Sequence, residues 1–301
     1  MSRAPRFVDG DRESVARQTL QSATSGVVIV AHREDTTALR RTLIAEGFLV
    51  DEVRGPYSAE QRQFSASMRC LVNHANAWRI AAARPLPTIV IEADFVPVRG
   101  FGELPLPMPL EKLGNSLGYL YSVGPQIWDL ATPDVARGHG GGMVALAIPP
   151  NVASLLLKFC DHTLMANPSG KYSPFDSKVG YWLMEHGVES YIPYRHYGEH
   201  GGLGNPEHTQ AGLGRPHQAD VLQGRIAFPP SYAKGSILRL WSVRMRARAW
   251  GALRLLTGRL LAPHDLARGN RQELLRFALG RLLIATRPRP RPNQALEKVG
   301  Q

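Results

Sequence analysis

The sequence predicts an α/β fold: a mostly parallel, Rossmann-like sheet flanked by helices, followed by a basic helical appendage. Two observations predict this arrangement. Runs of β-branched and aliphatic residues alternate with segments of helical periodicity, as in repeated βαβ units. The charge is also uneven, because residues 234–291 hold fourteen Lys and Arg against two acidic residues, a net +12, whereas the rest of the chain nets −1.

The first strand, helix and strand are expected at 27–31, 35–45 and 48–53, and the β-branched run of the first strand starts just after Gly26. A helix through His74 and Trp78 follows, and then an apolar strand at 88–92. The later elements are expected as strands at 117–123, 143–148 and 188–193 and as helices at 152–159 and 178–186. This order places helices on both faces of the sheet.

The composition bounds the class of protein. A chain of 301 residues can bury a large core, and its mean hydropathy of −0.20 without a long apolar run predicts a soluble protein with no membrane span. Residues 1–25 lack the apolar core of a signal peptide, so we expect an N-terminal tail and a cytoplasmic location. Cys70 and Cys160 are too few for a disulfide framework and are expected to be reduced.

Glu92-Ala93-Asp94 follows the strand at 88–91 directly. Two carboxylates one residue apart at the carboxyl end of a buried strand can bind a hard divalent cation, Mn²⁺ or Mg²⁺, and the cation can bind the phosphates of an activated substrate. The alternative is a solvated strand end, because acidic residues often follow strands.

The helix before this strand carries Cys70, His74 and Trp78 at i, i+4 and i+8, along one stripe. Together, helix, strand and acids resemble glycosyltransferase family 25, whose pattern is Ser-His, then Trp, then a hydrophobic strand ending in Glu-Asp-Asp. Here Asn73 stands in place of the Ser and Ala93 in place of the middle acid. The likeness is good over residues 26–100, loose over 115–200 and absent beyond about 230.

The resemblance implies a GT-A-type domain over residues 26–233. It implies an inverting, metal-dependent transferase that moves a sugar from a nucleotide-sugar donor, such as a UDP-sugar. The implied acceptor is a bacterial surface glycan, free or lipid-linked, of the lipopolysaccharide, lipooligosaccharide or capsule type. The nucleotide is expected across the strand ends near Ala31, His32 and Arg33.

The resemblance also implies roles for individual acids and histidines. Asp94 would hold the metal with help from a late histidine, and Glu92 would orient the site or contact the nucleoside. Asp176, just before the helix at 178–186, is expected either as the helix N-cap or as the base that deprotonates the acceptor hydroxyl.

A histidine-rich stretch follows the last predicted strand. Four of the ten histidines lie within 22 residues: His196, His200, His208 and His217. His200 is the first choice for the metal because the glycines after it permit close approach to a pyrophosphate, and His196 is the second. The alternative for each is a loop-packing or surface role.

The glycine run ending at Gly141 and Gly142 is expected as a turn that opens the strand at 143–148. Such a turn either lets backbone approach the ligand or only supplies positive φ.

The C-terminal region predicts basic amphipathic helices over residues 234–287 and an Arg/Pro-rich tail over 288–301. Such helices, with tryptophan at the edge of the apolar face, can lie on an anionic membrane surface. The expected surface is the inner face of the cytoplasmic membrane. The alternative is a pair of helices packed on the domain. Nucleic acid is not expected as a partner, because stacking aromatics and a known binding motif are missing.

A second function from another class fits the same features. Ala93, Asn73 and the basic tail also suit a non-catalytic membrane-surface protein on a degenerate transferase fold. A nucleotidyl- or phosphotransferase would use paired acids as well, but the chain has no phosphate-loop signature.

Overall fold

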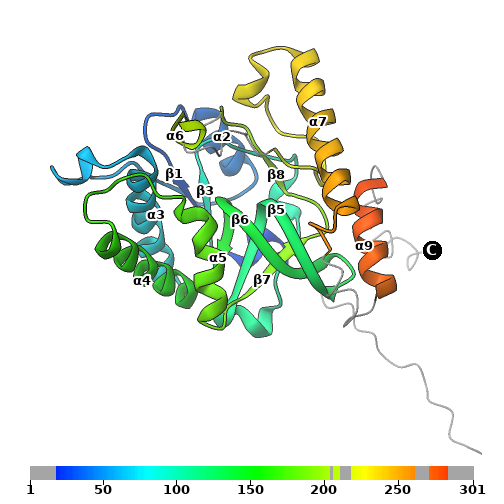
Figure 1. Cartoon of the computed structure of the whole chain (residues 1–301), viewed down its shortest axis with the longest axis horizontal. Helices are drawn as coiled ribbons and strands as arrows, with labels where there is room; N and C mark the ends of the chain where they lie inside the picture. The colour runs from blue at the N-terminus through cyan, green and yellow to red at the C-terminus, as the bar shows by residue number, and fades with distance from the viewer. Residues whose placement is uncertain (1–17, 204–205, 211–217, 262–270, 284–301) are drawn as a thin grey trace, which may run out of the picture.

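The computed structural model describes residues 18–203, 206–210, 218–261 and 271–283. A six-stranded sheet in the order β2-β1-β3-β6-β5-β7 forms its centre (Figure 1). The strands are β1 (Val27–Val30), β2 (Val50–Val53), β3 (Thr88–Glu92), β5 (Ser116–Thr132), β6 (Val135–Ile148) and β7 (Glu189–Pro193). β1 pairs parallel with β2 and β3, and β5 pairs parallel with β7, whereas β6 is antiparallel to its neighbours. The predicted mostly parallel α/β sheet is therefore confirmed, and it is compatible with a Rossmann-like fold.

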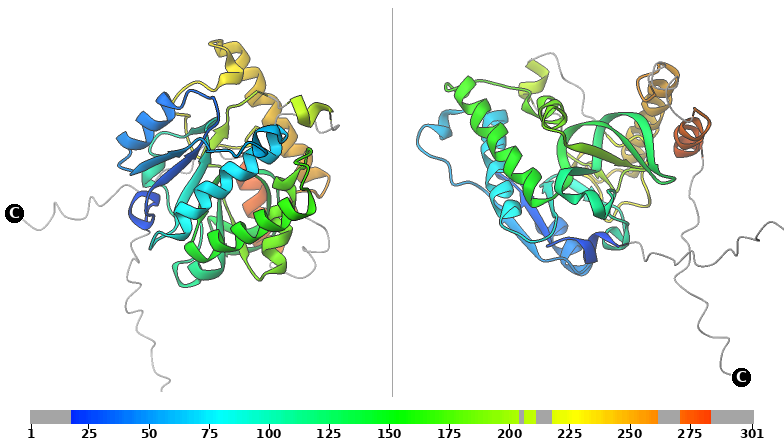
Figure 2. Two further views of the ribbon diagram at one scale, coloured as in Figure 1. Left: turned by 90° about the vertical axis from the view of Figure 1, so that its left-hand side faces the viewer. Right: turned by 90° about the horizontal axis from the view of Figure 1, so that it is seen from below.

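Strand periodicity sorts the sheet side chains into two cores, because successive residues point to opposite faces. One core contains Val28, Val30 and Val90, and it is covered by α3 (Ala66–Ala82), α4 (Pro150–Ala166) and α5 (Phe175–Glu185). The other contains Val27 and Ile89, and it is covered by α1 (Leu20–Ala23) and α2 (Thr37–Ala45). Figure 2 shows α3 and α4 side by side on the same face. Helices on both faces are thus confirmed.

β5 and β6 are much longer than the strands expected at 117–123 and 143–148, and the glycine run lies inside β6. Gly142 has φ +81, and a Cβ at Gly140 would lie 2.7 Å from the Ser122 Cβ of the neighbouring strand. The glycines therefore let β5 and β6 pack closely through an irregular register. The expected turn at Gly141 is wrong.

A second, two-stranded sheet consists of β4 (Phe95–Pro97) and β8 (Gly198–His200), which pair antiparallel. β4 begins three residues after β3 ends, and β8 comes from the histidine-rich stretch. Its register places Phe95 opposite His200. This small sheet therefore brings the late histidines back to the acidic motif.

Four short helices lie between or after these strands. They are the 3₁₀ helices η1 (Gln61–Gln63), η2 (Phe101–Glu103) and η3 (Leu110–Asn115) and the α-helix α6 (Pro206–Gln210). α5 begins earlier than the predicted 178, with Pro174 as its N-cap residue and Asp176 in its first turn. The N-cap role expected for Asp176 is therefore wrong.

The 3₁₀ helix η4 (Ser231–Ala233) precedes the basic segment, which forms α7 (Ile237–Leu256) and α9 (Arg271–Leu283). The two α-helices lie at one side of the molecule (Figure 1). α9 places Leu274 and Phe277 in the main core. Arg244 of α7 forms an ion pair with the fully buried Glu199, and Arg281 of α9 pairs with Asp220, Nη2 to Oδ1 2.6 Å. Both helices are thus packed on the domain through paired arginines.

Several regions of the sequence analysis fall wholly or partly outside the described residues: residues 1–17 of the N-terminal tail, parts of the histidine-rich stretch, residues 262–270 of the basic segment and the Arg/Pro-rich tail. Within the described helices, none is long and apolar enough to cross a membrane.

Candidate metal and nucleotide site

The site begins where β3 ends. Glu92 is the last residue of β3 and pairs in register with Val30 at the end of β1, so the acidic motif starts at the carboxyl edge of the sheet. The chain then turns through Ala93 and Asp94 into β4. Because β4 pairs with β8, Asp94 meets His200, with 3.1 Å between Asp94 Oδ2 and His200 Nε2.

The two side chains perturb each other's ionisation. Burial on its own would raise the pKa of Asp94, but the charge of His200 and its hydrogen bond outweigh burial and leave that pKa below its usual value. Burial would lower the pKa of His200, but Asp94 outweighs it and raises the pKa to about 9. At neutral pH the pair is therefore an aspartate bound to an imidazolium.

Gly201 and Gly202 allow this contact. The backbone N–H of Gly201 donates to the Asp94 carbonyl at 2.9 Å, and a Cβ at Gly202 would overlap Asp94 Oδ2. The glycines thus give close approach to the motif itself, whereas the sequence analysis assigned them an approach to a pyrophosphate. Any side chain at position 202 would displace the Asp94 carboxylate.

The buried side chain of His74 contacts Glu92 and positions it. His74 Nε2 lies 3.1 Å from Glu92 Oε1, and the imidazole is fully buried between Trp78 and Phe175, with ring centroids 5.7 and 6.3 Å away. His74 thus packs beneath the motif strand and supports Glu92.

The residues present fit a divalent cation. One ligand atom each from Glu92, Asp94 and His200 lies within 4.8 Å of the others. In the part of the chain that the structure describes, Asp94 Oδ1 is buried without a hydrogen-bond partner. Two carboxylates and an imidazole suit Mn²⁺ in particular, since this ion accepts both oxygen and imidazole ligands, and Mg²⁺ prefers oxygen.

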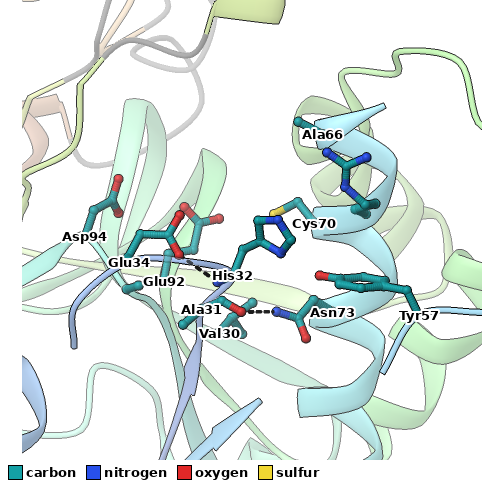
Figure 3. Close-up of a pocket in the computed structure, with 12 residues that line it drawn as sticks. Val30, Ala31, His32, Glu34, Tyr57, Ala66, Cys70, Asn73, Glu92 and Asp94 are labelled. Atoms are coloured by element: carbon teal, nitrogen blue, oxygen red, sulfur yellow. Dashed lines mark hydrogen bonds between the residues drawn. The ribbon is translucent and has the colours of Figure 1, made fainter. Parts of the chain in front are cut away.

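A cavity of about 190 Å³ opens beside Glu92 and Asp94 (Figure 3), and His200 is not among the residues that line it. Its lining comes from the ends of β1 and β3, from α3 and from the loop after β2: Val30, Ala31, His32, Glu34, Tyr57, Ala66, Arg69, Cys70, Asn73, Glu92, Ala93 and Asp94. The carboxylates gather on one side, and α3 forms the other side. Two residues of the predicted nucleotide segment, Ala31 and His32, line the cavity, whereas Arg33 does not.

Asn73 fixes the floor of this cavity. Its amide donates to the carbonyl of Ala31 at 2.7 Å and to that of Val53 at 3.2 Å, and it accepts from the Gly55 N–H at 3.0 Å. These bonds tie the ends of β1 and β2 to α3. The residue that departs from the Ser-His pattern therefore has a structural role of its own.

Glu34 is a site residue that the sequence analysis missed. Its Oε2 accepts from the backbone N–H groups of His32 at 2.6 Å and of Arg33 at 3.0 Å, which closes the loop after β1. The signal was an acidic residue at the carboxyl end of a second parallel strand, beside the strand that ends in Glu92.

Asp176 is not among the residues that line the cavity, although its charge acts on the Cys70 thiol in the cavity wall. Burial raises the pKa of the Cys70 thiol well above its usual value, and the charges of Glu92 and Asp176 add to this shift. Because Cys70 lines the cavity, the Asp176 carboxylate acts electrostatically on its wall. Asp176 Oδ1 also accepts from the Ser177 N–H at 2.9 Å.

The remaining candidates do not belong to this site. Gly141 and Gly142 lie in β6 and are not among the residues that line the cavity. His196, the second choice for the metal, is buried against Asp220 and Arg281, with Nε2 2.9 Å from Asp220 Oδ1. The side chain of His208, and the whole of His217, lie outside the described residues.

Comparison with protein-family models found no match, and a search of curated proteins found none either.

Proposed function

We propose that this chain is a metal-dependent glycosyltransferase of GT-A type that transfers a sugar from a nucleoside diphosphate donor to a glycan acceptor. The observation behind the proposal is the cluster of Glu92, Asp94 and His200 at the carboxyl edge of the sheet, beside a cavity at the ends of β1 and β3. Open α/β sheets bind nucleotides at this edge. The sequence resemblance to family 25 supports the same assignment.

The charge of the cavity supports a cation together with a diphosphate. Its lining holds three carboxylates, those of Glu34, Glu92 and Asp94, and its one guanidinium, Arg69, donates to the backbone carbonyls of residues 62 and 64. A diphosphate alone would be repelled by such a lining. Bound Mn²⁺ or Mg²⁺ would supply the missing positive charge and stabilise the leaving nucleoside diphosphate.

The chain's own residues then have separate roles. Asp94 and His200 hold the cation, and Glu92, positioned by His74, completes or orients that set. His32 and Ala31 border the nucleoside. Asp176 accepts the proton from the acceptor hydroxyl as that oxygen attacks the anomeric carbon, which gives inversion in a single displacement.

A binding and turnover panel tests this proposal. Purified protein is titrated with UDP, GDP, CMP and their common sugar conjugates, with and without Mn²⁺, by calorimetry and thermal shift. We expect one nucleoside diphosphate to bind only in the presence of the metal, and Asp94→Asn to abolish that binding. Binding of no nucleotide with Mn²⁺ present would refute the proposal.

Donor hydrolysis and transfer then separate the two functions that the sequence allows. Release of nucleoside diphosphate from the bound donor, faster with a glycan acceptor, identifies the enzyme. Metal-dependent binding without any release would favour the non-catalytic alternative, in which the loss of an acid at Ala93 has removed turnover.

A further inference from the structure

α7 has two different faces. Towards the domain it buries Ala247 and Gly251, and an added Cβ at Gly251 would lie 2.6 Å from the Asp220 Cβ. The opposite side exposes large apolar side chains, which we name the outer face of α7: Ile237, Leu238, Trp241, Met245 and Leu256, each more than half exposed. At 100° per residue these five positions fall within about one third of the helix circumference. Exposed apolar patches of this kind mark surfaces that bind a partner or a membrane.

Three of the five arginines of α7 bond to the rest of the domain. Arg244 and Arg254 point inward, to Glu199 and to the backbone carbonyls of Gly124 and Pro125. Arg248 donates to the carbonyl of Leu282 in α9 at 2.6 Å. Arg239 and Arg246 are exposed and follow the outer face along one border. α7 contains no acidic residue. The outer face is thus apolar at its centre and cationic at its border.

This helix also starts close to the candidate site. The N–H of Tyr232 in η4 donates to the carbonyl of Gly201 at 3.1 Å, and Gly201 directly follows His200. Ile237, the first residue of α7, follows five positions after Tyr232. The N-terminal end of the outer face is therefore connected through η4 to the loop beside Asp94.

We propose that the outer face of α7 binds the surface of an anionic phospholipid bilayer. Tryptophan and aliphatic side chains enter the headgroup region, and Arg239 and Arg246 contact lipid phosphates. The border of arginines favours an anionic surface over a second copy of this chain, because two copies would bring like charges together. The proposal does not depend on sugar transfer, although it would place the candidate site near lipid-linked acceptors.

Vesicle flotation of the full chain tests the proposal. The probes are vesicles of phosphatidylcholine alone and of phosphatidylcholine mixed with phosphatidylglycerol. We expect flotation only with the anionic vesicles, and weaker flotation at high salt. Two double variants remove the apolar and the charged parts in turn: Leu238→Ser with Trp241→Ser, and Arg239→Gln with Arg246→Gln. Each should weaken anionic binding, the charge variant by about 30-fold.

Matched controls come from exposed residues elsewhere on the molecule. Leu49→Ser with Met165→Ser removes two exposed apolar side chains, and Arg41→Gln with Arg62→Gln removes two exposed charges. Both controls should float like the unmodified chain. Equal losses in controls and test variants, or undiminished flotation of the test variants, would overturn the proposal. Thermal melting confirms that each variant is folded.

Light scattering tests the other possible occupant of the outer face, a second copy of this chain. If the protein does not float and is a dimer that Leu238→Ser with Trp241→Ser converts to a monomer, the outer face is a self-association surface and the bilayer proposal is wrong. A monomer that floats supports it.

Discussion

Asp94 and His200 are 106 positions apart in the chain, yet Oδ2 and Nε2 lie 3.1 Å apart. β4 and β8 create this contact by pairing Phe95 with His200 immediately after β3 has delivered the acidic motif. In the absence of metal, a proton on His200 stabilises the aspartate. A divalent cation held by both residues would replace that proton.

Asp94→Asn should remove metal-dependent nucleotide binding and lower transfer by about 100-fold or more, the scale of losing one charge-stabilising group in an active site. The amide keeps the shape of the carboxylate and can still contact His200, so the thermal midpoint should change little. Calorimetry with Mn²⁺ and donor measures the loss. Asp129→Asn, at an exposed aspartate paired with Arg137, is the matched control and should bind normally. Normal Mn²⁺ binding by Asp94→Asn would exclude this residue as a ligand.

Metal affinity should depend on pH through His200. Its pKa is raised to about 9 in the metal-free protein, so below that pH the cation must displace a proton. The apparent affinity for Mn²⁺ should therefore rise by about tenfold per pH unit from 6.5 to 8.5. In His200→Ala the affinity should be low and the slope should disappear. A pH-independent affinity in the unmodified chain would show that His200 is not a ligand.

His74→Ala should mainly reduce stability. The imidazole is fully buried and bonds to Glu92, and losing a buried hydrogen-bond partner costs about 1–3 kcal/mol. Urea unfolding followed by fluorescence measures this loss. Activity per folded molecule should fall less than in Asp94→Asn, because Glu92 stays in place but is less well oriented. A variant that unfolds like the parent but has no activity would instead mean that His74 contacts substrate.

The resemblance to family 25 implied that a late histidine meets the acidic motif, and the two glycines after His200 favoured it among the four candidates. The sequence itself predicted the limits of β3 and the helices on both faces, since these follow from short-range periodicity. The same reasoning failed at Gly141 and Gly142. Glycines in a turn and glycines in a bulged, closely packed strand pair look alike until the neighbouring strand is known.

The pairing of Arg244 with Glu199 was equally invisible in the sequence. Local charge density marked the arginines of α7 as a surface feature, and only tertiary packing shows which of them point inward. Asn73 is similar, because its three bonds reach backbone groups on two separate strand ends.

Ala93→Asp should be tolerated and should raise the affinity for Mn²⁺ by about tenfold, since affinity for hard cations grows with the number of carboxylate ligands. Ala93 lines the cavity and is partly exposed, so the added carboxylate has room. Its backbone N–H donates to the Val30 carbonyl at 2.9 Å, a bond that the substitution leaves intact. Ala93→Asn is the uncharged control and should leave the affinity unchanged. An equal gain in both variants would attribute the effect to polarity instead of charge.

Truncation after residue 233 should abolish folding, although the charge distribution marks residues 234–291 as a separate basic segment. It removes Leu274 and Phe277 from the main core and leaves Glu199 buried without Arg244. Burial already raises the pKa of Glu199 in spite of that arginine, so the unpaired carboxylate would be still less favourable.

A single substitution isolates this effect. Arg244→Met should lower the free energy of unfolding by about 3–5 kcal/mol, the usual cost of removing one partner from a buried ion pair. Arg246→Met, two positions further along α7 and exposed, should change it by less than about 0.5 kcal/mol. Glu199→Gln combined with Arg244→Met should recover part of the loss, because no buried charge then remains. Equal stability of the two single variants would show that α7 is not held to the domain through Arg244, and the loss on truncation would then come from the core residues of α9 alone.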